Sequence, residues 1–243
     1  MKQHAAVIET LEKLGGIATL GQLYQEVLKS EDFGWNTKTP HASIRRIVQL
    51  RPEIYKIKPG LYGLESHRQK NEDQGIVVET PANKESPEVQ IFNHTYYQGL
   101  ILSLGNLQQM TTFAPHQDKN RQFLQQKIAD VRSLSVLPQF SYPELVKRSS
   151  TIDAIWFNER GMPTSFFEVE ASTDFYNSFL KFVDLQDFHV QMVIVADESR
   201  RAEYDTRIAH SSFASIQKRV VFRPYKTLIK QYEIAVEQSQ LNL

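Results

Sequence analysis

The chain's 243 residues suffice for one large domain or two smaller ones. Its 28 basic and 28 acidic residues give a net charge of zero, so a surface that binds nucleic acid would need local segregation of charge. The absence of cysteine excludes disulfides, zinc–thiolate sites and thiol catalysis. No apolar run approaches the roughly 20 residues that span a bilayer, and the N-terminus lacks the apolar core of a signal peptide, so we expect a cytoplasmic protein.

The first 50 residues carry the signals of three helices. Apolar side chains recur at helical spacing over residues 4–14, and the Gly15-Gly16 pair ends this predicted helix. Thr19 and Gln22 form a capping-box pattern that opens a second helix, which reaches about residue 29 and is followed by a loop at 30–36. Thr39-Pro40, a cap followed by proline at the first helical position, predicts a third helix over residues 40–49. In and just before this helix we expect exposed Lys38, His41, Ser43, Arg45 and Arg46, and buried Ile44, Ile47 and Val48.

Residues 54–64 predict a β-hairpin, because two short strands flank the Pro59-Gly60 turn. Three helices followed by such a hairpin are typical of a winged helix-turn-helix. More narrowly, residues 4–64 resemble the HARE-type winged helix of some restriction enzymes and chromatin proteins. The resemblance rests on the stretches AAVIETLEKLGGIATLGQLYQEV and YKIKPGLYGL and on the Thr39-Pro40 helix start. It implies DNA binding, with the third helix in the major groove.

Local charge supports this interpretation. Residues 38–58 contain six lysines and arginines and one acid, Glu53, a surplus that suits contact with phosphates. The predicted DNA-binding residues are Lys38, His41, Arg45, Arg46, Lys56 and Lys58. The alternative is a winged helix that contacts protein and whose basic face is merely solvated.

The composition predicts three segments: a winged-helix domain at 1–66, a polar linker at 67–88 and a second domain at 89–243. In the second domain the pattern predicts helix, strand, hairpin, helix, strand, helix, strand and a closing helix, which favours a mixed sheet with helices on both sides. The expected fold class is therefore α+β or α/β.

Three carboxylates mark the predicted hairpin at 150–170. Side chains alternate along a strand, so Glu168 and Glu170 should point to the same face, and Asp153 on the facing strand should meet them. Close like charges are costly unless a divalent cation neutralises them, which suggests a metal site. The alternative, surface acids on an exposed hairpin, suits Glu159 and Asp174 better than it suits the apolar stretch around Glu168.

This spacing, Ile152-Asp153 followed by Glu168-Val169-Glu170, resembles the PD-(D/E)XK nuclease superfamily, and residues 90–230 are similar to its restriction-endonuclease-like members. The resemblance implies hydrolysis of a DNA phosphodiester, with Asp153 and Glu168 as ligands of Mg²⁺ and Glu170 orienting or deprotonating the attacking water. Glu170 stands where the superfamily usually has lysine. Gln98, on the preceding helix, and Lys181, on the following one, are secondary candidates. None of the seven histidines shows metal-ligand spacing, and His94, His116, His189 and His210 are interpreted as structural or surface residues.

Three functions remain open on this basis. The first is a Mg²⁺-dependent endonuclease of restriction or phage-defence type that acts on double-stranded DNA, as a homodimer and with a possible cognate methyltransferase. The second is a non-catalytic DNA-binding regulator with a degenerate nuclease fold, which the missing lysine favours. The third is a nuclease directed at RNA.

Overall fold

The computed structural model describes residues 2–29, 35, 37–172 and 174–241. The chain divides into two compact units, which we call the N-terminal unit (Met1–Phe92 with Tyr232–Leu243) and the sheet unit (Asn93–Gln231). Helices α5 (Pro87–Leu107) and α10 (Tyr225–Leu241) each contribute residues to both units. Apart from residue 35, the predicted loop at 30–36 lies outside the described residues.

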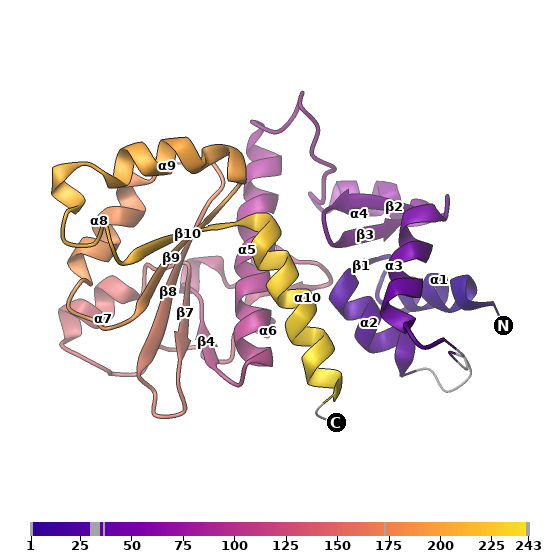
Figure 1. Ribbon diagram of the computed structural model, residues 1–243, viewed down its shortest axis with the longest axis horizontal. Helices are drawn as coiled ribbons and strands as arrows, with labels where there is room; N and C mark the ends of the chain where they lie inside the picture. The colour runs from indigo at the N-terminus through magenta and orange to yellow at the C-terminus, as the bar shows by residue number, and fades with distance from the viewer. Residues whose placement is uncertain (1, 30–34, 36, 173, 242–243) are drawn as a thin grey trace. The chain divides into compact units, whose positions relative to one another are not determined.

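The N-terminal unit combines three helices with a small antiparallel sheet (Figure 1). The helices are α1 (Gln3–Lys13), α2 (Leu20–Leu28) and α3 (Pro40–Leu50). The strands are β1 (Ile17–Thr19), β2 (Ile54–Lys58) and β3 (Leu61–Leu64), in the order β1-β3-β2. The predicted hairpin is confirmed, and Gly60 takes a φ of 75° in its turn. Strand β1 is absent from the sequence-based prediction.

The start of α2 has the predicted capping box. The backbone N–H of Gln22 donates to the Thr19 hydroxyl at 3.0 Å, and the Thr19 N–H donates to the Gln22 side chain at 2.9 Å. These two bonds satisfy donors that the first turn of a helix leaves unpaired.

Part of the segment predicted as a linker folds against the N-terminal unit. Residues 67–88 include α4 (Arg68–Asp73), which follows a 3₁₀ turn, η1 (Glu65–His67). The buried Asn71 of α4 donates to the Tyr55 hydroxyl of β2 at 3.0 Å, and Ile76 is also buried. This segment therefore contributes to the packing around β2.

The sheet unit is built on a five-stranded mixed sheet in the order β10-β9-β8-β7-β4 (Figure 1). The strands are β4 (Thr111–Phe113), β7 (Ala154–Phe157), β8 (Pro163–Glu170), β9 (Gln191–Ala196) and β10 (Val220–Pro224). Strands β8, β9 and β10 run parallel, whereas β7 and β4 join as antiparallel neighbours. The predicted mixture of helices and a mixed sheet is thus confirmed.

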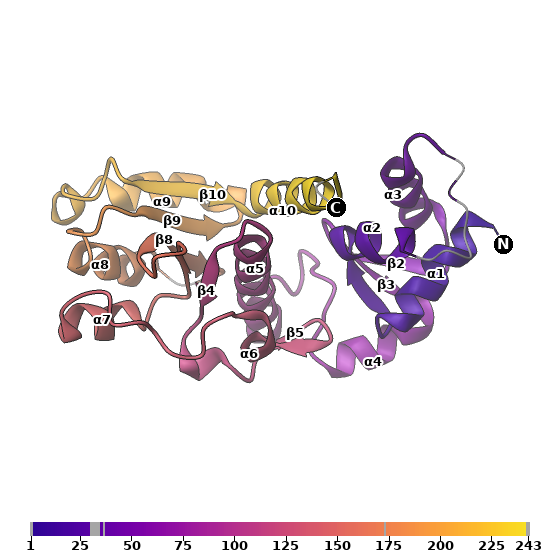
Figure 2. The same cartoon turned by 90° about the horizontal axis from the view of Figure 1, so that it is seen from below.

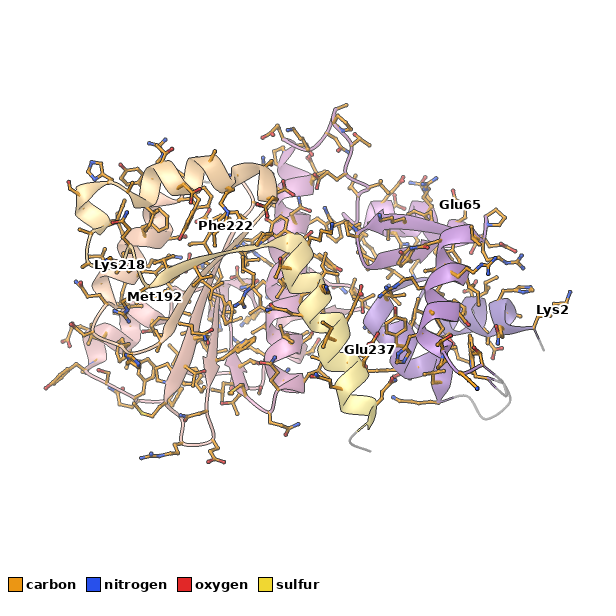
Figure 3. All side chains as sticks on the ribbon, in the orientation of Figure 1. Lys2, Glu65, Met192, Lys218, Phe222 and Glu237 are labelled. Atoms are coloured by element: carbon orange, nitrogen blue, oxygen red, sulfur yellow. The ribbon has the colours of Figure 1, made fainter. Side chains whose placement is uncertain are left out.

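Helices cover both faces of this sheet (Figure 2). On one face, side chains such as Phe166 pack against α8 (Tyr176–Asp184) and α9 (Arg201–Ile208) in a large aromatic and aliphatic core. Met192 of β9 and Phe222 of β10, labelled in Figure 3, belong to this core. On the other face, the Trp156 indole donates to the Ile101 carbonyl of α5 at 3.1 Å. Glu168 and Glu170 share the parity of Phe166, so they lie on the face covered by α8.

Short elements complete the sheet unit between α5 and β7 and around α9. They are η2 (His116–Asp118), β5 (Gln122–Phe123), β6 (Gln126–Lys127), α6 (Ile128–Val131), α7 (Pro143–Ser149), η3 (Glu198–Arg200) and η4 (Ser211–Phe213). The two-stranded β5-β6 ribbon in this region is absent from the sequence-based prediction.

Candidate active site

Asp153 lies immediately before β7, where the chain enters the sheet. Its Oδ2 atom accepts a hydrogen bond from the backbone N–H of Val169 at 2.8 Å and lies 3.2 Å from Nε2 of His94. The Asp153 N–H in turn donates to Oε1 of Glu168 at 3.3 Å. These contacts join the start of β7 to the end of β8, so Asp153 and Glu168 meet as the sequence predicts.

Glu168 is buried and is paired with a cation. The ammonium group of Lys181, on α8, lies 2.9 Å from Oε1 and 2.7 Å from Oε2 of Glu168. The same nitrogen donates to the Thr151 carbonyl at 2.8 Å. Lysine is therefore present beside the acids, supplied by the helix that follows β8 and not by β8 itself.

Glu170 and Glu168 both contact one hydroxyl. The Ser178 Oγ atom of α8 lies 2.9 Å from Oε2 of Glu168 and also hydrogen-bonds Oε1 of Glu170. A hydroxyl has a single hydrogen, so it cannot donate to two carboxylates at once. The arrangement therefore suits a carboxyl that keeps its proton, or a cation that relieves the repulsion.

These side chains line one cavity of about 420 Å³ in the sheet unit. The lining residues are His94, Arg148, Asp153, Glu168, Val169, Glu170, Asn177, Ser178, Leu180 and Lys181. The cavity thus combines three acids with potential cations from α5, α7 and α8. This mixture gives it a polarised, partly enclosed interior.

The environment moves the pKa values of two acids in opposite directions. Burial, and then the neighbouring charge of Asp153, raise the pKa of Glu168 to about 8. Burial alone would raise the pKa of Asp153, but His94, Lys181 and the Val169 N–H together hold it below its ordinary value. For Lys181, the attraction of Glu168 and Asp153 outweighs burial and raises the pKa, so its ammonium stays charged.

The carboxylates fit a hard divalent cation as a pair. Among the residues that the structure describes, no three His, Cys, Asp or Glu side chains are grouped closely enough to hold a metal ion. Mg²⁺, however, commonly takes one or two carboxylates and completes its shell with water and phosphate oxygens. Asp153 and Glu168 provide that pair. The pKa of Glu168 is raised first by burial and then by the charge of Asp153, and a bound cation would relieve the repulsion between the two acids.

The two secondary candidates, Gln98 and Lys181, make different contacts. Gln98 of α5 is buried, and its side-chain nitrogen donates to the Asp153 carbonyl at 2.7 Å and to Oδ2 of Asp118 at 3.0 Å. It therefore holds the backbone of Asp153 and does not contact the carboxylates of the trio. Lys181 contacts Glu168 directly, as described above.

His94, which the sequence-based interpretation treats as a structural or surface residue, has a place in the candidate site. It lies in the cavity, in contact with Asp153. Ser178 and Asp118 are likewise absent from the prediction. The sequence carries one usable signal, because His94 and Gln98 are four residues apart and so lie on the same face of α5.

The predicted DNA-binding residues fall into two groups. Lys38, Arg45, Arg46 and Lys56 are exposed, as expected, and three of them, Lys38, Arg46 and Lys56, form the first group. The other three contact neighbouring side chains within the N-terminal unit: Lys58 is buried and pairs with Glu79 at 2.8 Å, Arg45 pairs with Glu233 at 2.9 Å, and His41 stacks on Tyr24 and contacts Gln240 at 3.0 Å.

Three expectations for side-chain exposure in α3 are wrong. His41 and Ser43 are half-buried and not exposed, because His41 packs between Tyr24 and the end of α10. Ile47 is half-buried and not fully buried.

Comparison with known families identifies the second half of the chain. A profile of the type II restriction enzyme NmeDI C-terminal domain matches residues 76–242, more than half of the chain. The chain belongs to this family. The matched region, which belongs to a restriction enzyme family, includes every residue of the candidate active site from His94 to Lys181.

No curated protein and no solved structure matches the chain. Within the described part of the chain, no helix combines the length and apolarity that crossing a membrane requires.

Proposed function

We propose that this protein is a Mg²⁺-dependent endonuclease of restriction or defence type that hydrolyses phosphodiesters in double-stranded DNA. One observation carries the proposal: Asp153, Glu168 and Lys181 converge in one cavity of a chain that belongs to a restriction enzyme family. An acid on one strand, an acid on the next and a nearby lysine are the parts that the resemblance to the PD-(D/E)XK superfamily implies.

Asp153 and Glu168 would hold the Mg²⁺ through carboxylate oxygens. When bound, this ion supplies a Lewis acid that polarises the scissile phosphate and lowers the pKa of a bound water. The protein's part is to keep both carboxylates in place, Asp153 through the Val169 N–H and Glu168 through Ser178 and Lys181.

Lys181 would take the role of the superfamily's usual lysine. Its ammonium stays charged beside Glu168 and is therefore available to contact the phosphate or to orient the attacking water. Glu170 occupies the usual lysine position in sequence and would accept a proton from that water or complete the polar shell around it. In the hydrolysis, the water oxygen bonds to phosphorus as the bond to the leaving oxygen breaks.

DNA recognition would belong to the N-terminal unit, which we propose is a HARE-type winged helix. Three helices and the β2–β3 hairpin support this assignment. A cavity of about 600 Å³ beside α3 adds support, because Lys2, His4, Arg46 and Arg51 line it and no acid does. Lys38, Arg46 and Lys56 are the residues best placed to contact phosphates.

The competing function is a DNA-binding regulator whose nuclease fold is inactive. Two observations favour it. Lys181 already neutralises Glu168, and the described residues provide no third acid or histidine to complete a metal site. Under the endonuclease proposal, cutting both strands requires two active sites, so the protein would act as a homodimer, with a cognate methyltransferase to protect host DNA.

The experiment is a plasmid-cleavage assay with Mg²⁺ on methylated and unmethylated DNA. Wild type should nick or linearise at least one substrate, whereas Glu168→Ala should bind DNA equally well and leave it intact. The matched control is Glu159→Ala, an exposed glutamate in the turn of the same hairpin, which should cleave like wild type. If wild type binds DNA and cuts none of these substrates, the regulator is the better account.

A further inference from the structure

A closed ring of polar side chains surrounds Asp153 on the side of α5. His94 contacts the Asp153 carboxylate at 3.2 Å, and Nη1 of Arg121 lies 3.1 Å from the other ring nitrogen of His94. Nε of Arg121 pairs with Oδ1 of the buried Asp118 at 3.0 Å. Gln98 closes the ring, because its side-chain nitrogen reaches both Asp118 and the Asp153 carbonyl.

Arg121 decides which nitrogen of His94 carries the hydrogen. A guanidinium is always protonated and can only donate, so Nδ1 of His94 must accept. The hydrogen of the ring therefore sits on Nε2, which faces Oδ2 of Asp153. This is the tautomer that donates to the carboxylate.

The two donors to Asp153 converge on the same oxygen. Oδ2 receives the Nε2–H of His94 and the backbone N–H of Val169. Among the described residues, none bonds Oδ1 of Asp153. The carboxylate is thus fixed in one rotation, with one oxygen engaged by the protein and the other open.

We infer that His94 is a positioning residue, oriented by Arg121 and Asp118, that fixes Asp153 so that Oδ1 is the oxygen offered to the divalent cation. This inference rests on the proposed function and adds to it a residue that touches neither metal nor DNA. Partners of this kind hold a ligand in its binding geometry, and their loss typically weakens metal binding by about 10–100-fold.

Three substitutions separate this role from simple packing. His94→Gln places an amide N–H where Nε2–H lies, whereas His94→Leu keeps comparable bulk and removes the donor. Arg121→Ala keeps the His94 imidazole but removes the donor that fixes its tautomer. The control His189→Leu changes an exposed histidine of the same unit that makes no hydrogen bond to a described residue.

The measurement is Mg²⁺ affinity of the full-length protein by calorimetry, with thermal melting of each variant alongside. We expect His94→Leu to bind Mg²⁺ about 10–100-fold more weakly, Arg121→Ala to show a smaller loss, and His94→Gln and His189→Leu to stay within about threefold of wild type. If His94→Leu melts early, the comparison of Arg121→Ala with His94→Gln decides in its place.

Two outcomes overturn different claims. If Asp153→Ala abolishes binding while His94→Leu and Arg121→Ala bind like wild type, the role of His94 is wrong and the metal site stands. If wild type binds no Mg²⁺, or Asp153→Ala binds as tightly as wild type, the proposed metal site fails and the role of His94 fails with it.

Discussion

At the scale of single residues, the lysine missing from β8 is replaced in space by Lys181. Glu170 occupies the sequence position, but the ammonium that contacts Glu168 comes from α8, eleven positions further along the chain. An ammonium group acts through its position in space and not in sequence, so a lysine on α8 can serve the acids of β8. The absence of lysine at position 170 is therefore weak support for an inactive fold.

Mutation of Lys181 tests directly whether its ammonium does the work of the lysine that β8 lacks. We expect Lys181→Met to lower the cleavage rate by about 10²–10⁴-fold, in the range of a lost proton-transfer or positioning group, with DNA affinity nearly unchanged. Lys181→Arg keeps the charge and should retain part of the rate. Single-turnover cleavage and a DNA-binding titration measure the two quantities. Equal cleavage rates for Lys181→Met and wild type would show that Lys181 has no role in cleavage.

Protonation of Glu168 should make metal binding depend on pH. With the pKa of Glu168 raised to about 8, the metal-free site holds a proton at neutral pH that the metal must displace. The apparent Mg²⁺ affinity should therefore rise by up to about tenfold per pH unit between pH 6 and 8 and level off above pH 8. Calorimetry across this range measures it. Glu168→Gln, which cannot titrate, should bind weakly with no such slope, and a flat profile for wild type would contradict the prediction.

At the scale of elements, α5 is positioned by close contacts at two glycines. A Cβ atom built on Gly99 would lie 2.2 Å from the Phe123 ring, and one on Gly105 would lie 2.6 Å from Trp156. These positions let α5 approach the β5–β6 ribbon and the sheet closely. The same helix carries His94 and Gln98, so its placement sets the geometry around Asp153.

Gly99→Ala should therefore destabilise the protein, although alanine favours helices. Overpacking of a filled core typically costs about 1–3 kcal/mol, which outweighs the helix propensity gained, about 1 kcal/mol. Chemical denaturation of the purified protein measures the free energy of unfolding. Ser103→Ala on the same helix, which removes only a bond to the Gly99 carbonyl, is the control and should change stability by much less. A stabilised Gly99→Ala would show that Phe123 moves freely.

Helix α3 offers a matched pair of arginines for testing DNA contact. Arg46 is exposed and lines the basic cavity, whereas Arg45 pairs with Glu233. If α3 faces DNA phosphates, Arg46→Ala should weaken binding at all sequences and reduce the slope of log affinity against log salt by about 1. Arg45→Ala should change the slope less. Binding measured between low and moderate salt gives both values, and identical slopes for the three proteins would contradict a phosphate contact at Arg46.

The sequence alone predicts the elements well, because their signals are local. The Thr19–Gln22 capping box, the Pro59-Gly60 turn and the alternation around Glu168 each depend on a few neighbouring residues, and each is found in the structure. Strand β1 is different: its three residues carry no pattern of their own and become a strand through pairing with β3. Local pattern therefore locates most elements but not those that depend on a distant partner.

The same distinction applies to the site. The convergence of Asp153 and Glu168 follows from a hairpin and is predictable. His94 contacts Asp153, 59 positions further along the chain, and Asp118 contacts Gln98, 20 positions before it. No local sequence pattern predicts these two contacts. The engagement of His41 by the end of α10 and of Lys58 by Glu79 is equally non-local, which is why fewer of the predicted DNA-binding residues are exposed than the sequence suggests.

At the scale of the whole molecule, the chain combines a unit that carries exposed basic residues around α3 with a unit that carries the acidic cavity. Such a division of labour suits a protein that reads DNA with one unit and cuts it with the other.

The most direct test follows plasmid cleavage as Mg²⁺ is added back to EDTA-treated full-length protein. Wild type should be inactive without the metal and recover cleavage as Mg²⁺ rises, Glu159→Ala should follow the same curve, and Asp153→Ala should stay inactive at every concentration while still binding DNA. Cleavage by wild type in EDTA, or full activity of Asp153→Ala, would contradict a metal-dependent site built on Asp153 and Glu168.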